Sequence, residues 1–386
     1  MIKKDIYAPI FLFIVMAVVF VVGYSVCFGA ASDMYVTAAG AGGKSGVNWS
    51  DAFGLAEFET DAEGGSEAGD TYYIAGGTYS WTDRIKAETR HGTILAPISF
   101  IGVKSGTTAE PPVAADWAYG ADRPHFDGDA EYFQFGNYIK FFNIRITVTS
   151  AYTGVVVSGL SNIFNVSVIG TTCTVGGINL ASYGVVSYSS SKCTNSTAFA
   201  LSNVSGNHLY AYDSVTGMTL AGRGTLINSA IDTCTTGVTL AVSDANYRLN
   251  ISGNTFYGST TCLSLTGTFT NIFPIFNNIF DNCTTGISAA NDMTGSPAAI
   301  DYNLYSNNTA DVTNVDKGAN SVTSDITFTD APGQDFTLPD SSVAEGAGMQ
   351  VDTNINIVGD YNWNIGVDQT DTQAGGGGSV TVGYSN

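Results

Sequence analysis

Hydrophobic residues in the C-terminal half of the chain recur in short blocks separated by polar turns. Four stretches superpose on one another: Leu226–Leu240, Ile251–Leu265, Ile275–Ala289 and Ile300–Asn314. Each contains one aliphatic or aromatic anchor, namely Ile231, Phe256, Phe280 and Tyr305. The anchors follow one another at steps of 25, 24 and 25 residues. A repeat of this length, made of short β-like segments, is typical of a stacked solenoid.

The same pattern continues toward the N-terminus in a looser form. Gly217 and Gly237 occupy related positions 20 residues apart, which indicates shorter coils in that region. We expect about eight coils between Tyr138 and Val312 and about two or three before them, with strands stacked ~4.8 Å apart. The anchors then form interior columns, and the residue after each anchor faces outward because side chains alternate along a strand.

One polar position recurs beside the strands. Asn254, Asn278 and Asn303 are equivalent in three successive coils, in a predicted turn. Asparagine tolerates the left-handed backbone that such turns require, and stacked side-chain amides can bond one another along the column. We interpret this asparagine column as structural.

The composition supports an all-β fold outside the cytoplasm. Only 12% of the residues are charged, 45 are glycine, and the formal net charge is −20. So acidic a chain repels nucleic acid and anionic membranes, and neither is expected as a partner.

The N-terminus has the order of a secretory signal. Lys3 and Lys4 precede an apolar run from Ile6 to Phe28, and small residues follow up to Ala31. We expect residues 1–31 to be a signal peptide, and the chain from residue 32 to be secreted or displayed at the cell surface. The apolar run is also long enough for an uncleaved membrane anchor, which N-terminal sequencing of exported protein would reveal.

Cysteines remain after this segment in an odd number: Cys173, Cys193, Cys234, Cys262 and Cys283. They cannot all pair within one chain. Because all five fall inside the repeat pattern, we expect buried free thiols and no disulfide framework.

The repeats resemble the coils of right-handed parallel β-helix proteins of the pectate-lyase-like superfamily. The flanks are similar as well: Tyr35-Val36, the glycine-rich Gly40–Gly46, the predicted helix Trp49–Phe58 and the stretch Gly69–Tyr79 resemble the N-terminal cap of secreted members, with Ser50 as a candidate helix cap. The resemblance implies a cap over residues 32–69, coils over 70–315 and a closing segment over 316–370. Residues 371–386 read as a Gly/Ser-rich flexible tail.

The resemblance implies a polysaccharide partner but does not identify a reaction. Characterised relatives of this fold are mostly polysaccharide lyases, glycoside hydrolases and adhesive or spike proteins. The sequence lacks the paired aspartates with Gly-His-Gly of the best-known hydrolases, a serine elbow, and histidines at metal-ligand spacing. No cofactor is expected, although a calcium site assembled from separate coils leaves no compact motif.

Two groups of polar residues are candidates for a binding site. Arg223 and Arg248 are 25 residues apart, so they occupy equivalent positions in adjacent coils, where an anionic sugar would relieve their repulsion. The alternative is neutralisation by Asp213 or Asp244 in a solvated loop.

The second group follows the interior anchors by one residue. Asp232, Tyr257 and Asp281 would form an outward column, with the two carboxylates two coils apart, roughly 9 to 10 Å. That separation is near the upper limit for the carboxyl pair of an inverting glycosidase, and Tyr257 could stack on a sugar ring. The alternative is an ordinary polar outer face.

Three functions stay open. The first is a secreted β-helix that binds extracellular polysaccharide without turnover. The second is a polysaccharide lyase or glycoside hydrolase that acts on an acidic glycan. The third is a structural component of an envelope or a phage spike, for which a trimer is one option.

Overall fold

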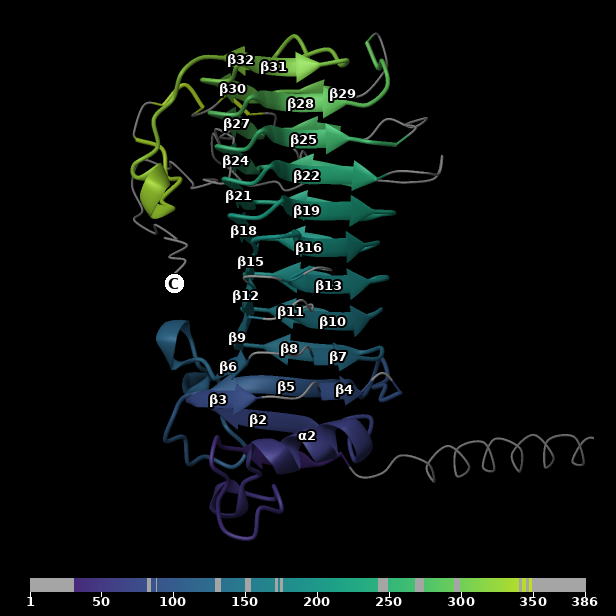
Figure 1. Cartoon of the computed structure of the whole chain (residues 1–386), viewed down its shortest axis with the longest axis vertical. Helices are drawn as coiled ribbons and strands as arrows, with labels where there is room; N and C mark the ends of the chain where they lie inside the picture. The colour runs from purple at the N-terminus through teal and green to yellow at the C-terminus, as the bar shows by residue number, and fades with distance from the viewer. Residues whose placement is uncertain are drawn as a thin grey trace, which may run out of the picture.

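A computed structural model describes residues 31–348, apart from residues 82–84, 88, 129–132, 150–153, 171–172, 174–175, 242–248, 268–273, 295–298, 340–341 and 345–346. The predicted signal peptide, except for its last residue, and the predicted tail lie outside the described residues. The described chain winds as a right-handed parallel β-helix with three long sheets of 11, 11 and 10 strands (Figure 1). Every pairing between these strands is parallel, and the strands of each coil visit the sheets in the same order.

Sheet 1 contains β1 (Asp33–Val36), β2 (Thr71–Ala75), β5 (Ile98–Val103), β8 (Ile139–Phe142), β11 (Asn162–Phe164), β14 (Val185–Ser187), β17 (Ser205–Asn207), β20 (Gly224–Ile227), β23 (Leu249–Ser252), β26 (Pro274–Phe276) and β29 (Ala299–Asp301). Sheet 2 contains β3 (Thr78–Trp81), β6 (His125–Gly128), β9 (Arg145–Val148), β12 (Ser167–Gly170), β15 (Ser190–Cys193), β18 (Tyr210–Tyr212), β21 (Ala230–Asp232), β24 (Thr255–Tyr257), β27 (Ile279–Asp281), β30 (Leu304–Ser306) and β32 (Val322–Thr323). Sheet 3 contains β4 (Ile85–Ala87), β7 (Phe133–Phe135), β10 (Val155–Ser158), β13 (Ile178–Ala181), β16 (Thr197–Ser202), β19 (Thr216–Ala221), β22 (Thr236–Ala241), β25 (Thr261–Leu265), β28 (Thr285–Ala289) and β31 (Ala310–Thr313).

The predicted interior column is confirmed. Ile231, Phe256, Phe280 and Tyr305 pair in register in β21, β24, β27 and β30, and each is 0% exposed. The three aromatic rings stack along the helix axis with centroids 4.8 and 5.3 Å apart. One apolar column therefore connects successive coils, which no coil could bury alone.

The asparagine column is confirmed as a hydrogen-bonded ladder between sheets 1 and 2. The Asn254 amide donates to Asn278 Oδ1 at 2.9 Å, and the Asn278 amide donates to Asn303 Oδ1 at 3.0 Å. All three residues are 0% exposed. Because each amide also bonds main-chain groups of neighbouring coils, the ladder fixes the corner of the solenoid.

A short helix closes the N-terminal end. Helix α2 (Leu55–Gly64) buries Phe58 completely, and the Phe58 ring contacts Tyr72, Phe100 and Phe126. The expected capping role of Ser50 is wrong: Gly54 precedes the helix, and Ser50 lies in the 3-10 turn η1 (Trp49–Asp51). Within the described part of the chain, no helix is long and apolar enough to span a membrane.

The prediction of free cysteines is wrong for four of the five. Disulfides join Cys173 to Cys193 and Cys262 to Cys283, and Cys234 is a buried free thiol. Each bridge spans 20 or 21 residues, slightly less than one coil. Cys262 lies in β25 and Cys283 in the turn after β27 of the next coil, which brings their Cα atoms within 6.2 Å.

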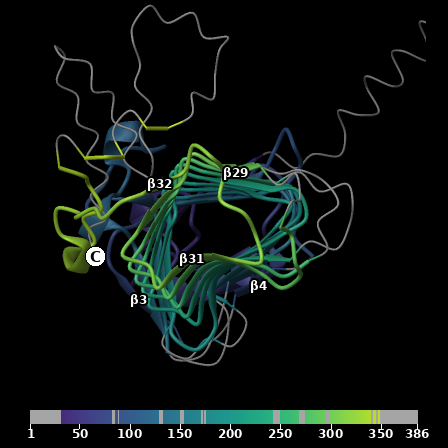
Figure 2. The same ribbon diagram turned by 90° about the horizontal axis from the view of Figure 1, so that it is seen from above.

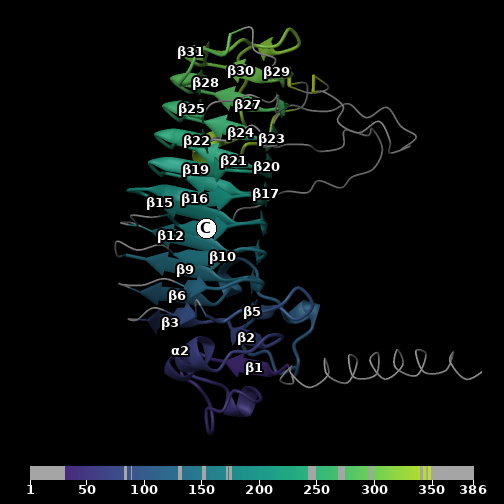
Figure 3. The same ribbon diagram turned by 90° about the vertical axis from the view of Figure 1, so that its right-hand side faces the viewer.

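The C-terminal chain folds back over the outside of sheet 2 (Figure 2). Residues 325–338, here named the strap, include the short 3-10 helix η4 (Ala331–Gly333) and the buried side chains Ile326, Phe328 and Phe336. A second insertion, with η2 (Ala114–Asp116) and η3 (Gly120–Asp122), lies beside the same sheet toward the N-terminal end. Sheet 3 faces away from both (Figure 3).

Candidate functional site

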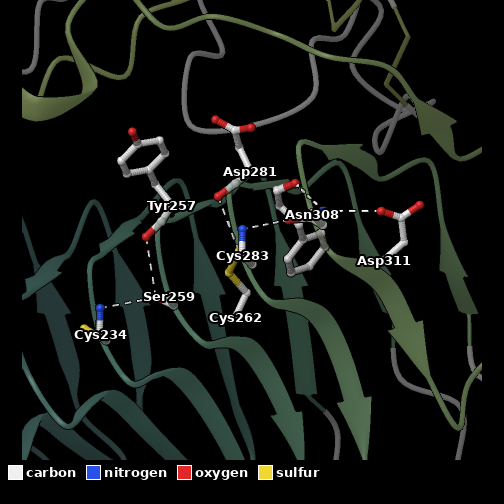
Figure 4. Close-up of a disulfide and its surroundings, with 9 residues drawn as sticks. Cys234, Tyr257, Ser259, Cys262, Asp281, Cys283, Asn308 and Asp311 are labelled. Atoms are coloured by element: carbon white, nitrogen blue, oxygen red, sulfur yellow. Dashed lines mark hydrogen bonds between the residues drawn. A yellow bond between two sulfur atoms is a disulfide. The ribbon is translucent and has the colours of Figure 1, made fainter.

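The predicted column of Asp232, Tyr257 and Asp281 exists. These residues pair in register in β21, β24 and β27, next to the interior anchors. Figure 4 shows Tyr257 and Asp281 on the outer side of their strands, with the Cys262–Cys283 disulfide below. The column faces outward but is not open to solvent, because Asp232 is 6% and Asp281 4% exposed. The strap covers them: Phe336 lies 5.8 Å from Tyr257 between ring centroids.

Burial changes the chemistry of both carboxyl groups. It raises the pKa of Asp232 to about 6, even though the Tyr210 hydroxyl donates a 2.9 Å hydrogen bond to Asp232 Oδ2. Burial also raises the pKa of Asp281, whose Oδ1 accepts a 2.9 Å hydrogen bond from Asn307. Both acids are therefore more readily protonated than free aspartate.

The predicted arginine pair lies at a different corner of the coil. Arg223 is exposed in the turn between β19 and β20, where its main-chain N–H donates to Asn203 Oδ1 at 2.8 Å. Arg248 lies outside the described residues; Leu249, which follows it, pairs with Gly224, which follows Arg223. Asp213 is committed elsewhere, to Lys192 at 2.7 Å.

Among the predicted site residues that the structure describes, Arg223 lies apart from the acidic column. Strand β20 of sheet 1 separates Arg223 from the strand that carries Asp232. The acidic column and the arginine therefore face different directions around the coil.

The outer face of sheet 3 is unlike that of sheet 2. From β13 to β28 its strands contain no charged residue. Threonines line it in register, at Thr197, Thr216, Thr236, Thr261 and Thr285. Sheet 3 of these coils therefore offers a ligand hydroxyl groups but no charged side chain from its described strands.

A basic group lies on sheet 2 between the N-terminal insertion and the strap. His125 in β6 pairs in register with Arg145 in β9, and Arg123 lies two residues before His125, the first residue of β6. Arg123 is 9% exposed and donates to the Gly120 carbonyl at 3.0 Å and to Asn165 O at 3.2 Å. Its role is to tie the insertion to the coils.

Arg145 is the least satisfied cation of this group. Its half-buried side chain makes no hydrogen bond or ion pair with any described residue. Its positive charge also affects the pKa values of neighbouring groups. Burial lowers the pKa of His125 and that of Arg123, and the positive charge of Arg145 lowers both further. Three cationic or protonatable groups thus converge in a protein with a net charge of −20.

Sequence reasoning missed this group for a definable reason. His125 and Arg145 are 20 residues apart, whereas Thr78, the partner of His125 in the preceding coil, is 47 residues away. Insertions of unequal length hide the register in the N-terminal coils. The only available signal was the outward position of both residues in alternating strands.

Metal binding has no support from the described side chains. No three His, Cys, Asp or Glu residues among them converge on one point. This finding concerns the described residues alone and does not decide whether the protein binds calcium.

Comparison with known proteins identifies the fold. No family model and no curated protein sequence matches the chain. Among solved structures, the crystal structure of pectate lyase Pel9A is similar: it is 15% identical, with a TM-score of 0.62 over 89% of this chain and 98% of that one. A rhamnogalacturonan lyase is 11% identical, with a TM-score of 0.54 over 80% of this chain and 95% of that one. The chain thus has the pectate-lyase-like β-helix fold that its repeats predicted.

Proposed function

We propose that the protein is a secreted β-helix that binds an acidic extracellular polysaccharide along the exposed part of sheet 2. The observation that carries the proposal is the half-buried guanidinium of Arg145, which has no partner among the described residues. A carboxylate that bonds it would be bidentate and charge-assisted. An anionic chain repelled by the rest of this acidic surface would be drawn to that group.

The names of the similar structures agree with an acidic glycan. Pectate and rhamnogalacturonan carry carboxylates, and the proteins named for them share this fold. A shared fold does not imply a shared activity, so the proposed binding must be tested by changing individual site residues.

The test compares two arginine variants. Loss of one charged hydrogen bond removes about 1.5 to 3 kcal/mol, so Arg145→Ala should weaken pectate binding about tenfold or more, measured by calorimetry. Arg223→Ala is the control, because it removes one arginine from an exposed position elsewhere on the coil. A neutral glucan should bind neither variant nor the parent.

The results separate the alternatives. If Arg223→Ala weakens binding and Arg145→Ala does not, the site lies at the corner of Arg223 and Arg248 instead. If no acidic glycan binds the parent protein, the proposal fails and a structural envelope or spike role becomes the better hypothesis.

Turnover by a lyase reaction is a second candidate, favoured by His125. With a lowered pKa its imidazole is neutral at neutral pH, and Thr147 Oγ1 lies 2.8 Å from Nε2. In β-elimination such a base takes the proton α to a carboxylate that a cation neutralises, while a double bond forms and the glycosidic C–O bond breaks. The leaving oxygen takes a proton from solvent water, and the imidazolium then returns its proton to solvent. His125→Ala would then abolish the ultraviolet absorbance of the unsaturated product while binding persists. No absorbance change with the parent protein would restrict the function to binding.

A further inference from the structure

The strap is attached to sheet 2 by rings rather than by main-chain bonds. Phe328 and Phe336 contact Tyr257, with centroids 6.1 and 5.8 Å apart, and Phe336 lies 6.5 Å from Tyr210. The last hydrogen bond that joins this segment to the coils runs from the Ile326 N–H to Ser306 Oγ, at 3.0 Å.

Beyond Ile326 the strap bonds only to itself, within the part of the chain that the structure describes. The Thr329 N–H donates to the Thr337 carbonyl at 2.9 Å, and Asp330 and Asp335 exchange main-chain bonds at 3.2 and 2.9 Å. The strap is thus a self-contained turn, and it can leave the sheet without breaking a ladder.

The apolar side chains of the strap cover carboxyl groups, whose burial in the charged form is unfavourable. Asp232 Oδ1 is buried and has no hydrogen-bond partner among the residues that the structure describes. Asp281 lies near Asp325 of the strap, whose charge disfavours ionisation of Asp281. No lysine or arginine follows Lys317 in the sequence, so the strap brings no cation to either carboxylate.

We propose that the strap is a cover that opens as the pH rises and exposes the Tyr210, Asp232, Tyr257 and Asp281 stretch of sheet 2. The movement of the strap is a property of the protein alone and does not rest on the proposed function.

The direction follows from the protonation of Asp232. Its pKa is about 6 beneath the strap, above the ordinary value of 3.8, so the closed form binds the proton more tightly than the open form. Closure is therefore favoured at acidic pH and loses this stabilisation as the pH rises through about 6. The difference between a pKa of about 6 and the ordinary 3.8 corresponds to at most about a 100-fold change in the closing equilibrium, and this change occurs between those two pH values.

Other charged groups around Asp232 do not reverse this sign. Asp232 is flanked by Tyr210 and Tyr212 on β18 and by Tyr257 on β24. Asp213, in the turn after β18, adds negative charge. Lys192 is paired with Asp213. On the strap, the side chains of Asp330 and Asp335 bond the strap's own N–H groups, at Gly333 and Thr337.

Hydrogen–deuterium exchange on the full chain tests the movement without any glycan. At about pH 5 the strap peptides should be better protected, and at about pH 7.5 they should exchange up to about tenfold faster after correction for intrinsic rates. Asp232→Asn, which cannot ionise, should keep the strap protected at both values. Asp127→Asn, on an exposed position of the same sheet, should behave like the parent.

Each outcome decides the inference. Equal protection of the parent strap at both pH values, or the same pH dependence in Asp232→Asn, would overturn the cover. Phe336→Ala should expose the strap even at about pH 5 while peptides from sheet 3 stay protected. Arg145→Ala, which tests the proposed glycan binding, should leave the exchange of the strap peptides unchanged.

Discussion

Replacement of Asn278 by alanine tests the asparagine ladder as the element that holds the corner between sheets 1 and 2. The Asn278 amide donates to the carbonyls of Ile251 and Phe276 and to Asn303 Oδ1, at 2.9, 3.0 and 3.0 Å. Its Oδ1 accepts from the main-chain N–H and the side-chain amide of Asn254, at 3.0 and 2.9 Å. Alanine removes all of these bonds at a fully buried position.

The expected magnitude follows from what is left without a partner. The Asn254 amide keeps its bond to the Leu226 carbonyl, but the Asn254 main-chain N–H loses the acceptor that Asn278 supplies. A buried orphan of this kind destabilises by about 1 to 3 kcal/mol, and the remaining lost bonds contribute about 1 kcal/mol each before relaxation. We expect Asn278→Ala to lower the free energy of unfolding by about 3 kcal/mol.

Chemical denaturation followed by far-ultraviolet circular dichroism measures this change. Asn179→Ala is the control, because Asn179 is half-buried on the outer side of β13 and no hydrogen bond of its side chain occurs within the described chain. That variant should change stability by less than about 0.5 kcal/mol. If the two variants are equally stable, the ladder does not hold the corner and the reasoning is refuted.

The cysteines give two further predictions. Replacing both Cys262 and Cys283 by serine should lower the free energy of unfolding by about 3 kcal/mol, the loop-closure value for a crosslink spanning 21 residues; an unchanged melting temperature would argue against the bridge. Burial raises the pKa of the Cys234 thiol to about 12, so a maleimide should label Cys234 only after unfolding. Rapid labelling of the native protein would contradict its burial.

The coils could be predicted because each one repeats the same short sequence pattern. An anchor such as Phe256 or Phe280 is followed by an outward residue and preceded by an asparagine turn, and stacking requires only the next coil. The register of four anchors was therefore readable from spacing alone. The disulfides were not, because Cys262 and Cys283 occupy different positions of adjacent coils and so fall outside the repeat step.

The candidate site depended on contacts that no repeat encodes. Asp232 faces away from the interior as alternation requires, but the strap that buries it comes from about a hundred residues later in the chain. Arg145 and His125 lie in coils whose insertions differ in length, which hid their pairing. Sequence periodicity therefore predicted whether each side chain points inward or outward. Its exposure to solvent and its interaction partners could be read only from the three-dimensional arrangement.

Strands β19 and β22 of sheet 3 have the sequences TGMTLA and TGVTLA and pair in register. The two strands match at five of six positions, and each contributes a buried apolar side chain, Met218 or Val238, and the same pair of threonine hydroxyls to its neighbours. A gene that duplicated or deleted one such unit would lengthen or shorten the molecule by one rung without repacking either end. The length of the solenoid is therefore a quantity that selection can adjust in steps of a single turn.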